Sequence, residues 1–351
     1  MRKTIAHRTL TAALMLTLFV GVTTTFSVCA QENTLVIAGY GGTWEAAMRK
    51  GVFPAFEAKY DVKVQLTAGS STDSIARVQA QRDAQPYDIM FADDGPMNQA
   101  VQMGLCAKLE GLDKKSLYPS AVFPNDMAVA YNQSAVGLMY NAKYFQDRGW
   151  PAPTSWKDLS DPKYKGKLIV PPLSNTYGLM TLLMFARMNG GSERNIDPGF
   201  KTLERDVAPD VIDFVPMPSQ MNDMFRSGQV VIAPNGSGFF KAFADTGFPV
   251  KFVYPKEGVP LVRGTMCLVA KPNRKPWASQ FINYVLSPQI QTFLAKEVAS
   301  GPVNIKVDPN IPQLGVAPVG KRAQRAVIFD WAAINAARPQ WNQRWNREVE
   351  R

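Results

Sequence analysis

The stretch LVIAGYGGTWEAAMRKGVFPAFEAKY, from Leu35 to Tyr60, predicts a strand, a glycine loop and a helix in that order. Apolar Leu35–Ala38 has the length of a buried strand, and a helix is expected from about Thr43. The loop between them lacks the spacing of a dinucleotide fingerprint, because Trp44 stands where G-x-G-x-x-G needs its third glycine. A phosphate loop ending in G-K-[ST] is also absent, so the role of this loop has to come from the rest of the chain.

The same order of elements recurs along the sequence. Strand-like runs at Val62–Leu66, PYDIMFADD, KGKLIVPP and VVIAPNGSG are each followed by polar residues and a helix-like segment. Strands that alternate with helices predict an α/β fold with a mainly parallel sheet. Ligands of such sheets bind beyond the carboxyl ends of the strands, where helix N-termini offer free N–H groups. The polar loops that follow these strands are therefore the candidate binding elements.

Length and charge narrow the classes of function. The 351 residues are enough for two domains, and the formal net charge is +10. Lysines and arginines are interspersed with acids rather than gathered in runs, so we expect a solvated surface and no nucleic-acid partner. Trp331, Trp341 and Trp345 lie among arginines in the tail and could stack RNA bases, but helices that pack these tryptophans onto the body explain them better.

Residues 1–30 predict a cleaved secretory signal. Three basic residues precede the apolar run Leu10–Val22, and small residues end at Ala30. The run is short and interrupted by threonines, which disfavours a membrane anchor, and Val28 disfavours acylation of Cys29. Cleavage after Ala30 would remove those three basic residues and lower the net charge from +10 to +7. We expect an exported, periplasmic protein.

Cysteine and histidine content limits the chemistry. Cys106 and Cys267 remain after cleavage, and the sequence leaves open whether they form a disulfide or stay as two buried thiols. The single histidine, His7, lies in the signal, which excludes Ser-His-Asp and Cys-His nucleophile systems and His-based metal sites from the mature chain. Asp93 and Asp94 form an acid pair, but sequence neighbours seldom face each other across a substrate. We expect a binding protein, without catalytic residues, metal or cofactor.

Two motifs resemble a known family. PTSWKDLSDPKYKGKLIVPP (Pro153–Pro172) and ASQFINYVLSPQIQTFLAKEVASGPVN (Ala278–Asn304) resemble the substrate-binding proteins of ABC importers, in the spermidine/putrescine-binding branch. The resemblance implies a type II periplasmic-binding fold, with two α/β lobes and a ligand cleft between them. It implies one lobe from residues 31–132 and 256–303, and another from 133–255 and 304–351 with C-terminal helices.

The same resemblance implies chain crossings near Tyr131–Ser134 and Tyr254–Gly258. Ligand would favour the closed form, which an inner-membrane ABC permease would then recognise. The protein is expected to act as a monomer. The loop after the first strand lines the cleft in this family, which implies ligand contacts for Tyr40, Gly41, Gly42 and Trp44; packing is the alternative role of Trp44.

The first-lobe loops offer further candidates. Ser70 and Ser71 lie at a predicted helix start and suit an anionic oxygen, with simple N-capping as the alternative. Asp93 follows a strand and suits an amine, although aspartate also caps turns at such positions.

The remaining candidates are the second-lobe loop residues Ser174, Asn175 and Thr176, the second-lobe helix-start residues Asn235 and Ser237, and Arg263 at the start of VRGTMCLVA. Arginine matches a carboxylate or phosphonate, and a surface or inter-lobe salt bridge is its alternative role. Polyamine binders usually place acids in the second-lobe loop, whereas this chain has none between Asp161 and Glu193. No adjacent tyrosine pair supports an Fe³⁺ site. We predict a small anionic or zwitterionic organic ligand, with a polyamine as the alternative.

Overall fold

The glycine loop joins strand β1 (Thr34–Gly39) to helix α1 (Gly42–Ala47), as the sequence predicts. This computed structural model describes residues 33–215 and 218–350, so the expected signal at 1–30 lies outside the described residues. Gly42 has φ 68°, a conformation that glycine adopts without the steric cost of a Cβ atom. The chain therefore turns from strand to helix across Tyr40 and Gly41 alone.

The first sheet combines strands from distant parts of the sequence. Besides β1 it contains β2 (Lys63–Ala68), β3 (Ile89–Asp93), β4 (Cys106–Ala107), β5 (Val129–Ala130) and β12 (Gly264–Val269). Its hydrogen-bonded order is β2-β1-β3-β12-β4, and β5 also pairs with β12. Strand β1 is parallel to β2 and β3, whereas β12 runs antiparallel to β3.

The second sheet is built around one long strand that the sequence analysis did not identify. Its strands are β6 (Ser134–Asn141), β7 (Leu168–Ile169), β8 (Val211–Asp213), β9 (Ile232–Gly236), β10 (Val250–Val253), β11 (Val259–Val262) and β13 (Ala326–Val327). The order is β13-β11-β6-β9-β7-β8, and β10 also pairs with β6. Because β6 is antiparallel to β9, β10 and β11, both sheets are mixed rather than mainly parallel.

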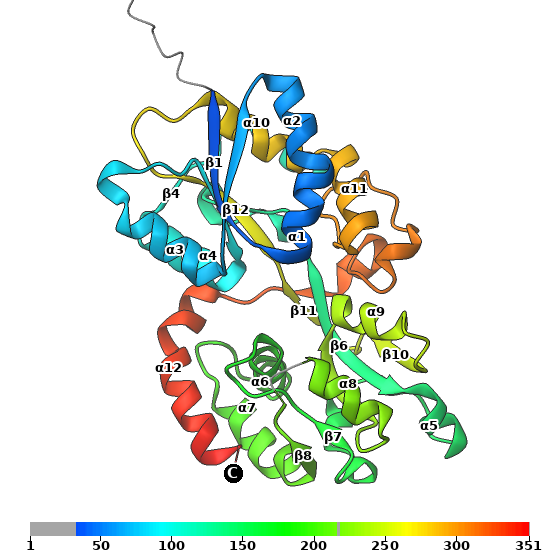
Figure 1. The fold of residues 1–351 in the computed structure, drawn as a ribbon. Coiled ribbons are helices and arrows are strands. Elements are labelled where there is room, and N and C mark those ends of the chain that lie inside the picture. Colours follow the sequence, from blue (N-terminus) through cyan, green and yellow to red (C-terminus); the bar gives the residue numbers. More distant parts are fainter. Residues whose placement is uncertain (1–32, 216–217, 351) are drawn as a thin grey trace, which may run out of the picture. The chain divides into compact units, whose positions relative to one another are not determined.

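Helices cover both faces of the first sheet (Figure 1). The helices after α1 are α2 (Phe53–Tyr60), α3 (Ser71–Ala80), α4 (Asp94–Gln102), α5 (Ala142–Asp147), α6 (Thr176–Met188), α7 (Asp197–Thr202), α8 (Pro218–Arg226), α9 (Ser237–Ala244), α10 (Pro276–Val285), α11 (Pro288–Val298) and α12 (Trp331–Glu348). One apolar cluster joins α2 and α10 to one face of the sheet, and a second cluster joins α3 and α4 to the other. Among the described residues, none of these helices is both long and apolar enough to cross a membrane.

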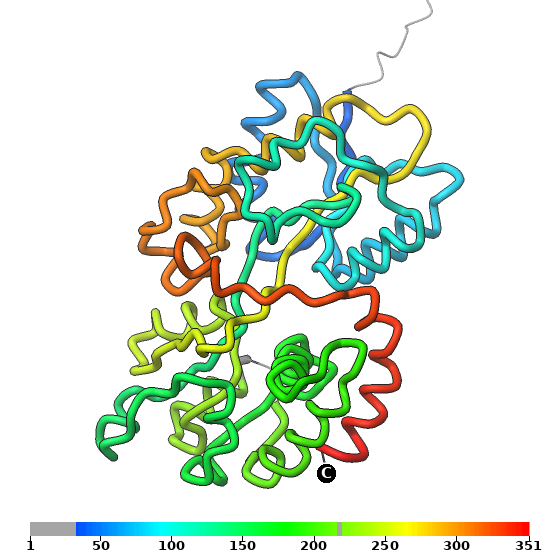
Figure 2. The backbone as a smooth tube through the Cα atoms, turned by 180° about the vertical axis from the view of Figure 1, so that it is seen from behind, coloured from blue at the N-terminus to red at the C-terminus, as the bar shows by residue number. Residues whose placement is uncertain are grey.

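The described chain passes between the two sheets three times, as the backbone in Figure 2 shows. The first passage is residues 131–133, between β5 and β6, where the sequence predicts one. The second is Arg263, between β11 and β12. This differs from the expected crossing at Tyr254–Gly258, because β11 pairs with β6 and β13 before the chain leaves the second sheet. The third passage lies between α11 and β13.

The three tail tryptophans are buried, so the packing interpretation of the tail is confirmed. Trp331, Trp341 and Trp345 are 5%, 6% and 0% exposed, and all three belong to the core that α6 dominates. A Cβ atom on Gly95 would lie 2.7 Å from the Trp331 ring, so this indole packs directly on the glycine. Helix α12 therefore lies against the start of α4 as well as against the second sheet.

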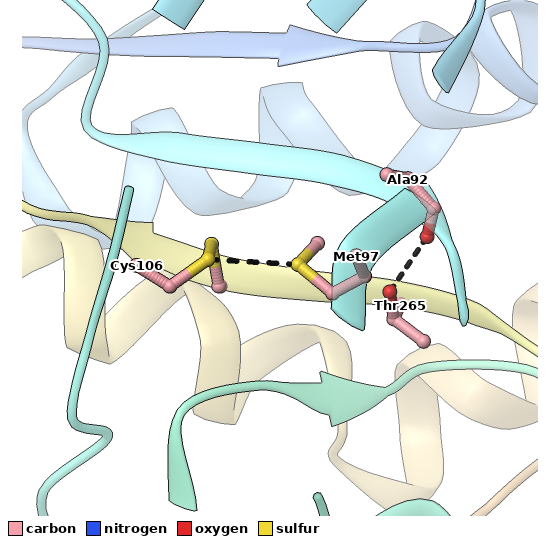
Figure 3. The surroundings of a disulfide bond; sticks show 5 residues. Ala92, Met97, Cys106 and Thr265 are labelled. Atoms are coloured by element: carbon pink, nitrogen blue, oxygen red, sulfur yellow. Dashed lines mark hydrogen bonds between the residues drawn. A yellow bond between two sulfur atoms is a disulfide. The ribbon is translucent and has the colours of Figure 1, made fainter. Parts of the chain in front are cut away.

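Cys106 and Cys267 form a disulfide, which answers the question that the sequence left open. The bridge joins β4 to β12, with the two Cα atoms 5.7 Å apart and a sequence separation of 161. Figure 3 shows Met97 against the Cys106 sulfur and the Thr265 hydroxyl donating to the Ala92 carbonyl over 2.6 Å. The disulfide thus closes a long loop inside the core of the first sheet.

Candidate functional site

A cavity of about 330 Å³ lies between the turn after β1 and the start of α9. Residues next to the first sheet, residues of β6 and α9 on the second sheet, and the first passage line it, namely Tyr40, Thr43, Trp44, Tyr131, Asn132, Gln133, Ser134, Ser237, Gly238, Lys241, Val298, Ala299, Ser300, Gly301, Leu314 and Ala317. Three residues predicted from two distant loops, Tyr40 and Trp44 from the first and Ser237 from the second, come together in this wall. Groups that lie next to each of the two sheets can therefore contact one small molecule.

Asp93 lies at the edge of this site, at the carboxyl end of β3. The Tyr40 hydroxyl donates to Asp93 Oδ1 over 2.9 Å, and the Asp93 backbone N–H donates to Ser71 Oγ over 3.0 Å. The side chain is exposed to solvent, yet the surrounding protein desolvates it. Burial raises the pKa of Asp93, while hydrogen bonds from Tyr40 and Ser71 lower it. A cation bound beside Asp93 would therefore stabilise its ionised form.

The negative charge of Asp93 acts on the side chains of three tyrosines. Burial raises the pKa of Tyr40, Tyr131 and Tyr177, and the negative charge of Asp93 raises it further in each case. Tyr40 and Tyr131 belong to the first sheet and its exit, whereas Tyr177 lies in the first turn of α6 on the second sheet. The three phenols stay protonated at neutral pH and present hydroxyl donors and ring faces near one carboxylate.

Aromatic contacts fix the orientation of this wall. Trp44 packs edge-on against Tyr40 at 5.6 Å between ring centroids and tilted against Phe91 at 4.9 Å. Tyr131 contacts both Trp44 and Phe91. Trp44 therefore has the packing role that the sequence analysis named as an alternative, and it also lines the cavity. An aromatic wall of this kind suits the apolar part of an organic ligand or a cationic head.

The helix starts use several predicted residues as caps. Ser70 Oγ accepts from the Asp73 N–H over 3.2 Å, and Asp73 Oδ2 accepts from the Ser70 N–H over 2.9 Å, forming a capping box. Asn175 Oδ1 accepts from the Tyr177 N–H over 2.8 Å at the start of α6. Gly41 is the N-cap residue of α1, and its neighbour Gly42 has open space beside it. These residues shape the loops whether or not ligand contacts them.

The remaining second-sheet candidates differ in orientation. Asn235 is 1% exposed, and its Oδ1 accepts from the Gly236 N–H over 2.8 Å, so its side chain is engaged by its own turn. Ser237 Oγ lies 3.0 Å from Ser134 Oγ and accepts from the Ala135 N–H over 3.1 Å. Exposed Ser174 and partly exposed Thr176 lie just before and at the start of α6.

Arg263 differs from its predicted role as a free guanidinium. Its Nε donates to Asp94 Oδ2 over 3.0 Å, and its Nη1 donates to the Ser120 carbonyl over 2.5 Å. The residue is 5% exposed and does not line the 330 Å³ cavity; it borders a separate, mainly apolar cavity beside Tyr118 and Ile328. Asp94 satisfies the charge, so the salt-bridge alternative describes this side chain.

Several wall residues were missed in the sequence analysis. Asn132 and Gln133 belong to the first passage and Ser134 begins β6, and any segment that crosses between two sheets must border the space between them. That signal could have found them, because the crossing itself was predicted. Lys241 lines the cavity about one helical turn after Ser237, and Tyr177, on which the charge of Asp93 acts, directly follows Thr176, but neither residue type indicated a role in the sequence. Lys241 pairs with Asp245 over 2.5 Å and is partly exposed.

The arrangement suits binding. The cavity wall offers hydroxyls, amides, aromatic rings and one ammonium group, with Asp93 at its edge. No group of three or more metal-binding side chains occurs in residues 33–215 and 218–350. The wall therefore favours an organic ligand held by hydrogen bonds and aromatic contact.

Comparison with known proteins agrees with this geometry. Residues 52–314 match the family described as bacterial extracellular solute-binding protein. Over 280 residues the chain is 24% identical to the spermidine/putrescine-binding periplasmic protein of Escherichia coli (strain K12), covering 76% of each chain.

Solved structures extend the similarity over almost the whole chain. An ABC transporter structure from Clostridium perfringens ATCC 13124 has a TM-score of 0.80 at 25% identity, covering 90% of this chain and 99% of that one. A structure described as the Atu4243-GABA receptor has a TM-score of 0.71 at 21% identity, covering 90% of this chain and 97% of that one. The fold is the two-lobed fold of periplasmic binding proteins.

Proposed function

Because the chain belongs to the bacterial extracellular solute-binding protein family, whose members are non-enzymatic solute-binding components of ABC transporters, we propose that its solute is a small organic zwitterion. The amine of this solute binds Asp93, and its apolar part lies along the aromatic wall. The observation that carries the proposal is the exposed, partly desolvated Asp93 carboxylate, which accepts from Tyr40 at the edge of a cavity lined by residues next to both sheets.

An amine is the group that best satisfies Asp93. Desolvation disfavours the ionised carboxylate, and a bound ammonium group would offset that penalty while donating up to three hydrogen bonds. Asp94 next to it is already paired with Arg263, so it offers no second free acid. The phenol rings of Tyr40 and Tyr177 near Asp93 add cation–π attraction for the same group.

A zwitterion fits better than the alternative, a polyamine. Two separated ammonium groups each need a carboxylate to replace the water they lose. The described residues that line the cavity include Lys241 and no carboxylate, so only Asp93 is available. The named polyamine relative and the structure described as a GABA receptor both concern small amines, which is consistent with an amine contact here.

Binding would couple to closure of the two lobes. Contacts to both sheets are made together only in the closed form, so the solute stabilises that form by its difference in affinity. We propose that the lobes divide near residues 131–133 and Arg263 and that the tail crosses back to the second lobe. We further propose that the protein acts in the periplasm as a monomer after signal cleavage and delivers solute to an inner-membrane permease.

A series of four-carbon ligands tests the proposal. Putrescine carries two amines, 4-aminobutanoate one amine and one carboxylate, and succinate two carboxylates on chains of the same length. Calorimetric titration and thermal melting of the purified protein should show the tightest binding and largest stabilisation with 4-aminobutanoate, or with its five- or six-carbon homologue. Strongest binding of putrescine would support the polyamine alternative, and strongest binding of succinate would refute the amine contact.

A further inference from the structure

Arg338 on α12 is a partly buried cation that pairs with no carboxylate among the described residues. Its Nη2 donates to the Ser174 carbonyl over 2.9 Å and to the Leu173 carbonyl over 3.4 Å. By contrast, Arg344 on the same helix pairs with Asp197 and Glu348. Backbone carbonyls orient the Arg338 guanidinium but do not neutralise its charge, and its Nε and Nη1 donors remain for another acceptor.

Helix α12 brings Arg338 close to the start of α4. Trp331 packs on Gly95, and Asn335 Nδ2 donates to the Gly95 carbonyl over 2.9 Å. Residues 331, 335 and 338 lie on one face of a helix, and the rise from 335 to 338 is about 4.5 Å. Gly95, two residues after Asp93 in the first turn of α4, and the Ser174 loop therefore lie beside the same turn of α12.

The first turn of α6 connects these two places. Ser174 lies three residues before Tyr177, and the charge of Asp93 acts on the Tyr177 phenol. Helix α12 thus contacts the Ser174 loop through Arg338 and the start of α4, next to Asp93, through Asn335. Burial without an anionic partner also lowers the pKa of Arg338, as expected for a cation whose lost water is not replaced by a counter-charge.

We infer that Arg338 binds the anionic group of the solute whose amine binds Asp93. This inference rests on the proposed function and supplies the cation that Arg263 does not provide. The guanidinium fork matches a carboxylate in two parallel hydrogen bonds, and Ser174 and Leu173 hold it in place beforehand. The distance between amine and carboxylate in a ligand of four to six carbons then becomes a determinant of specificity.

The test compares affinities for 4-aminobutanoate and putrescine in the wild type and in variants of Arg338. Arg338→Gln should weaken 4-aminobutanoate binding by about 10- to 100-fold and leave putrescine binding unchanged or tighter, because a repelling cation is removed. Arg338→Lys keeps the positive charge without the planar guanidinium, so its affinity for 4-aminobutanoate should lie between those of the wild type and Arg338→Gln. Arg347→Gln is the matched control on the same helix, because Arg347 is exposed and pairs with Glu348.

The measured quantity is the ratio of the affinities for 4-aminobutanoate and putrescine. Partial unfolding lowers both affinities together and therefore leaves this ratio unchanged. If Arg338→Gln does not fold, the same ratio in Arg338→Lys decides. An unchanged ratio in the variants, with a wild type that binds 4-aminobutanoate, overturns the role of Arg338 alone. A wild type that binds none of the four- to six-carbon amino acids overturns the proposed function itself.

Discussion

Arg263 Nε and Asp94 Oδ2 lie 3.0 Å apart, and both residues are almost completely buried. The backbone repeats the link, because the Asp94 N–H donates to the Arg263 carbonyl over 2.9 Å. Arg263 is the residue at which the chain leaves the second sheet for the first. The pair therefore fixes the start of α4, and with it the position of Asp93, to a segment that joins the two lobes.

Removing one partner of this pair should destabilise the protein strongly. Arg263→Ala leaves the Asp94 carboxylate buried without a counter-charge, which typically costs about 3–5 kcal/mol of unfolding free energy. Urea denaturation of the purified variant measures this loss. Arg226→Ala is the control, because Arg226 and Asp223 form an exposed pair whose removal should change stability little. Equal stability of the two variants would contradict the structural role of Arg263.

The stability of the wild type should also depend on Asp94 ionisation. Burial raises the pKa of Asp94 to about 6, although Arg263 opposes the shift, whereas an unfolded aspartate titrates near 3.9. Between these values the folded chain binds more protons than the unfolded chain, so the Asp94 contribution makes stability fall as pH rises from about 4 to about 6. The unfolding free energy of Asp94→Asn, subtracted from that of the wild type, isolates this contribution. A difference that is flat from pH 4 to 6, or rises, would count against it.

Asp93 should control the affinity for an amine. Asp93→Asn removes the carboxylate that the ammonium group needs, so we expect affinity for 4-aminobutanoate to fall by roughly 10- to 100-fold. In the wild type, affinity should decrease as pH falls through the raised pKa of Asp93, because the protonated acid no longer attracts the amine. Calorimetric titration between pH 4 and 8 measures both effects. Asp147→Asn, on exposed α5, is the control, and unchanged affinity in Asp93→Asn would refute the contact.

The disulfide should contribute to stability. Replacing Cys106 and Cys267 together with alanine releases a loop of 161 residues, and loss of such a bridge typically costs about 2–5 kcal/mol. Chemical denaturation of this double variant, and of the wild type with and without reductant, tests the expectation. Reduced wild type and double variant should unfold at similar, lower denaturant concentrations. Unfolding midpoints equal to that of the oxidised protein would rule the contribution out.

The sequence was informative where one local pattern determines one element. The apolar run Leu35–Ala38 is followed by a glycine turn and a helix-like segment, and the structure has β1 and α1 there. The tail tryptophans were correctly predicted to be packing residues, because large apolar side chains are usually buried where another surface can cover them. Strand β6 was missed because Ser134–Asn141 pairs only with distant segments, and the second crossing was expected too early because β11 also pairs with distant segments.

The candidate site was less predictable from local patterns. Tyr40, Asp93 and Ser237 end strands or begin helices, so their location at the carboxyl edges could be expected. Arg263 has the same local position, but its partner Asp94 lies 169 residues away, and no sequence spacing reveals such a pairing. Arg338 lies seven residues into a helix, where nothing local distinguishes it from Arg344. Its role depends on which acids the fold places nearby.

The most direct measurement is a crystal structure of the protein with the tightest-binding ligand of the four- to six-carbon series. We expect the ligand nitrogen within hydrogen-bonding distance of the Asp93 carboxylate, with the same molecule contacting residues next to both sheets. Ligand bound only to the second sheet, or in the cavity beside Arg263, Tyr118 and Ile328 with Asp93 left to solvent, would contradict it.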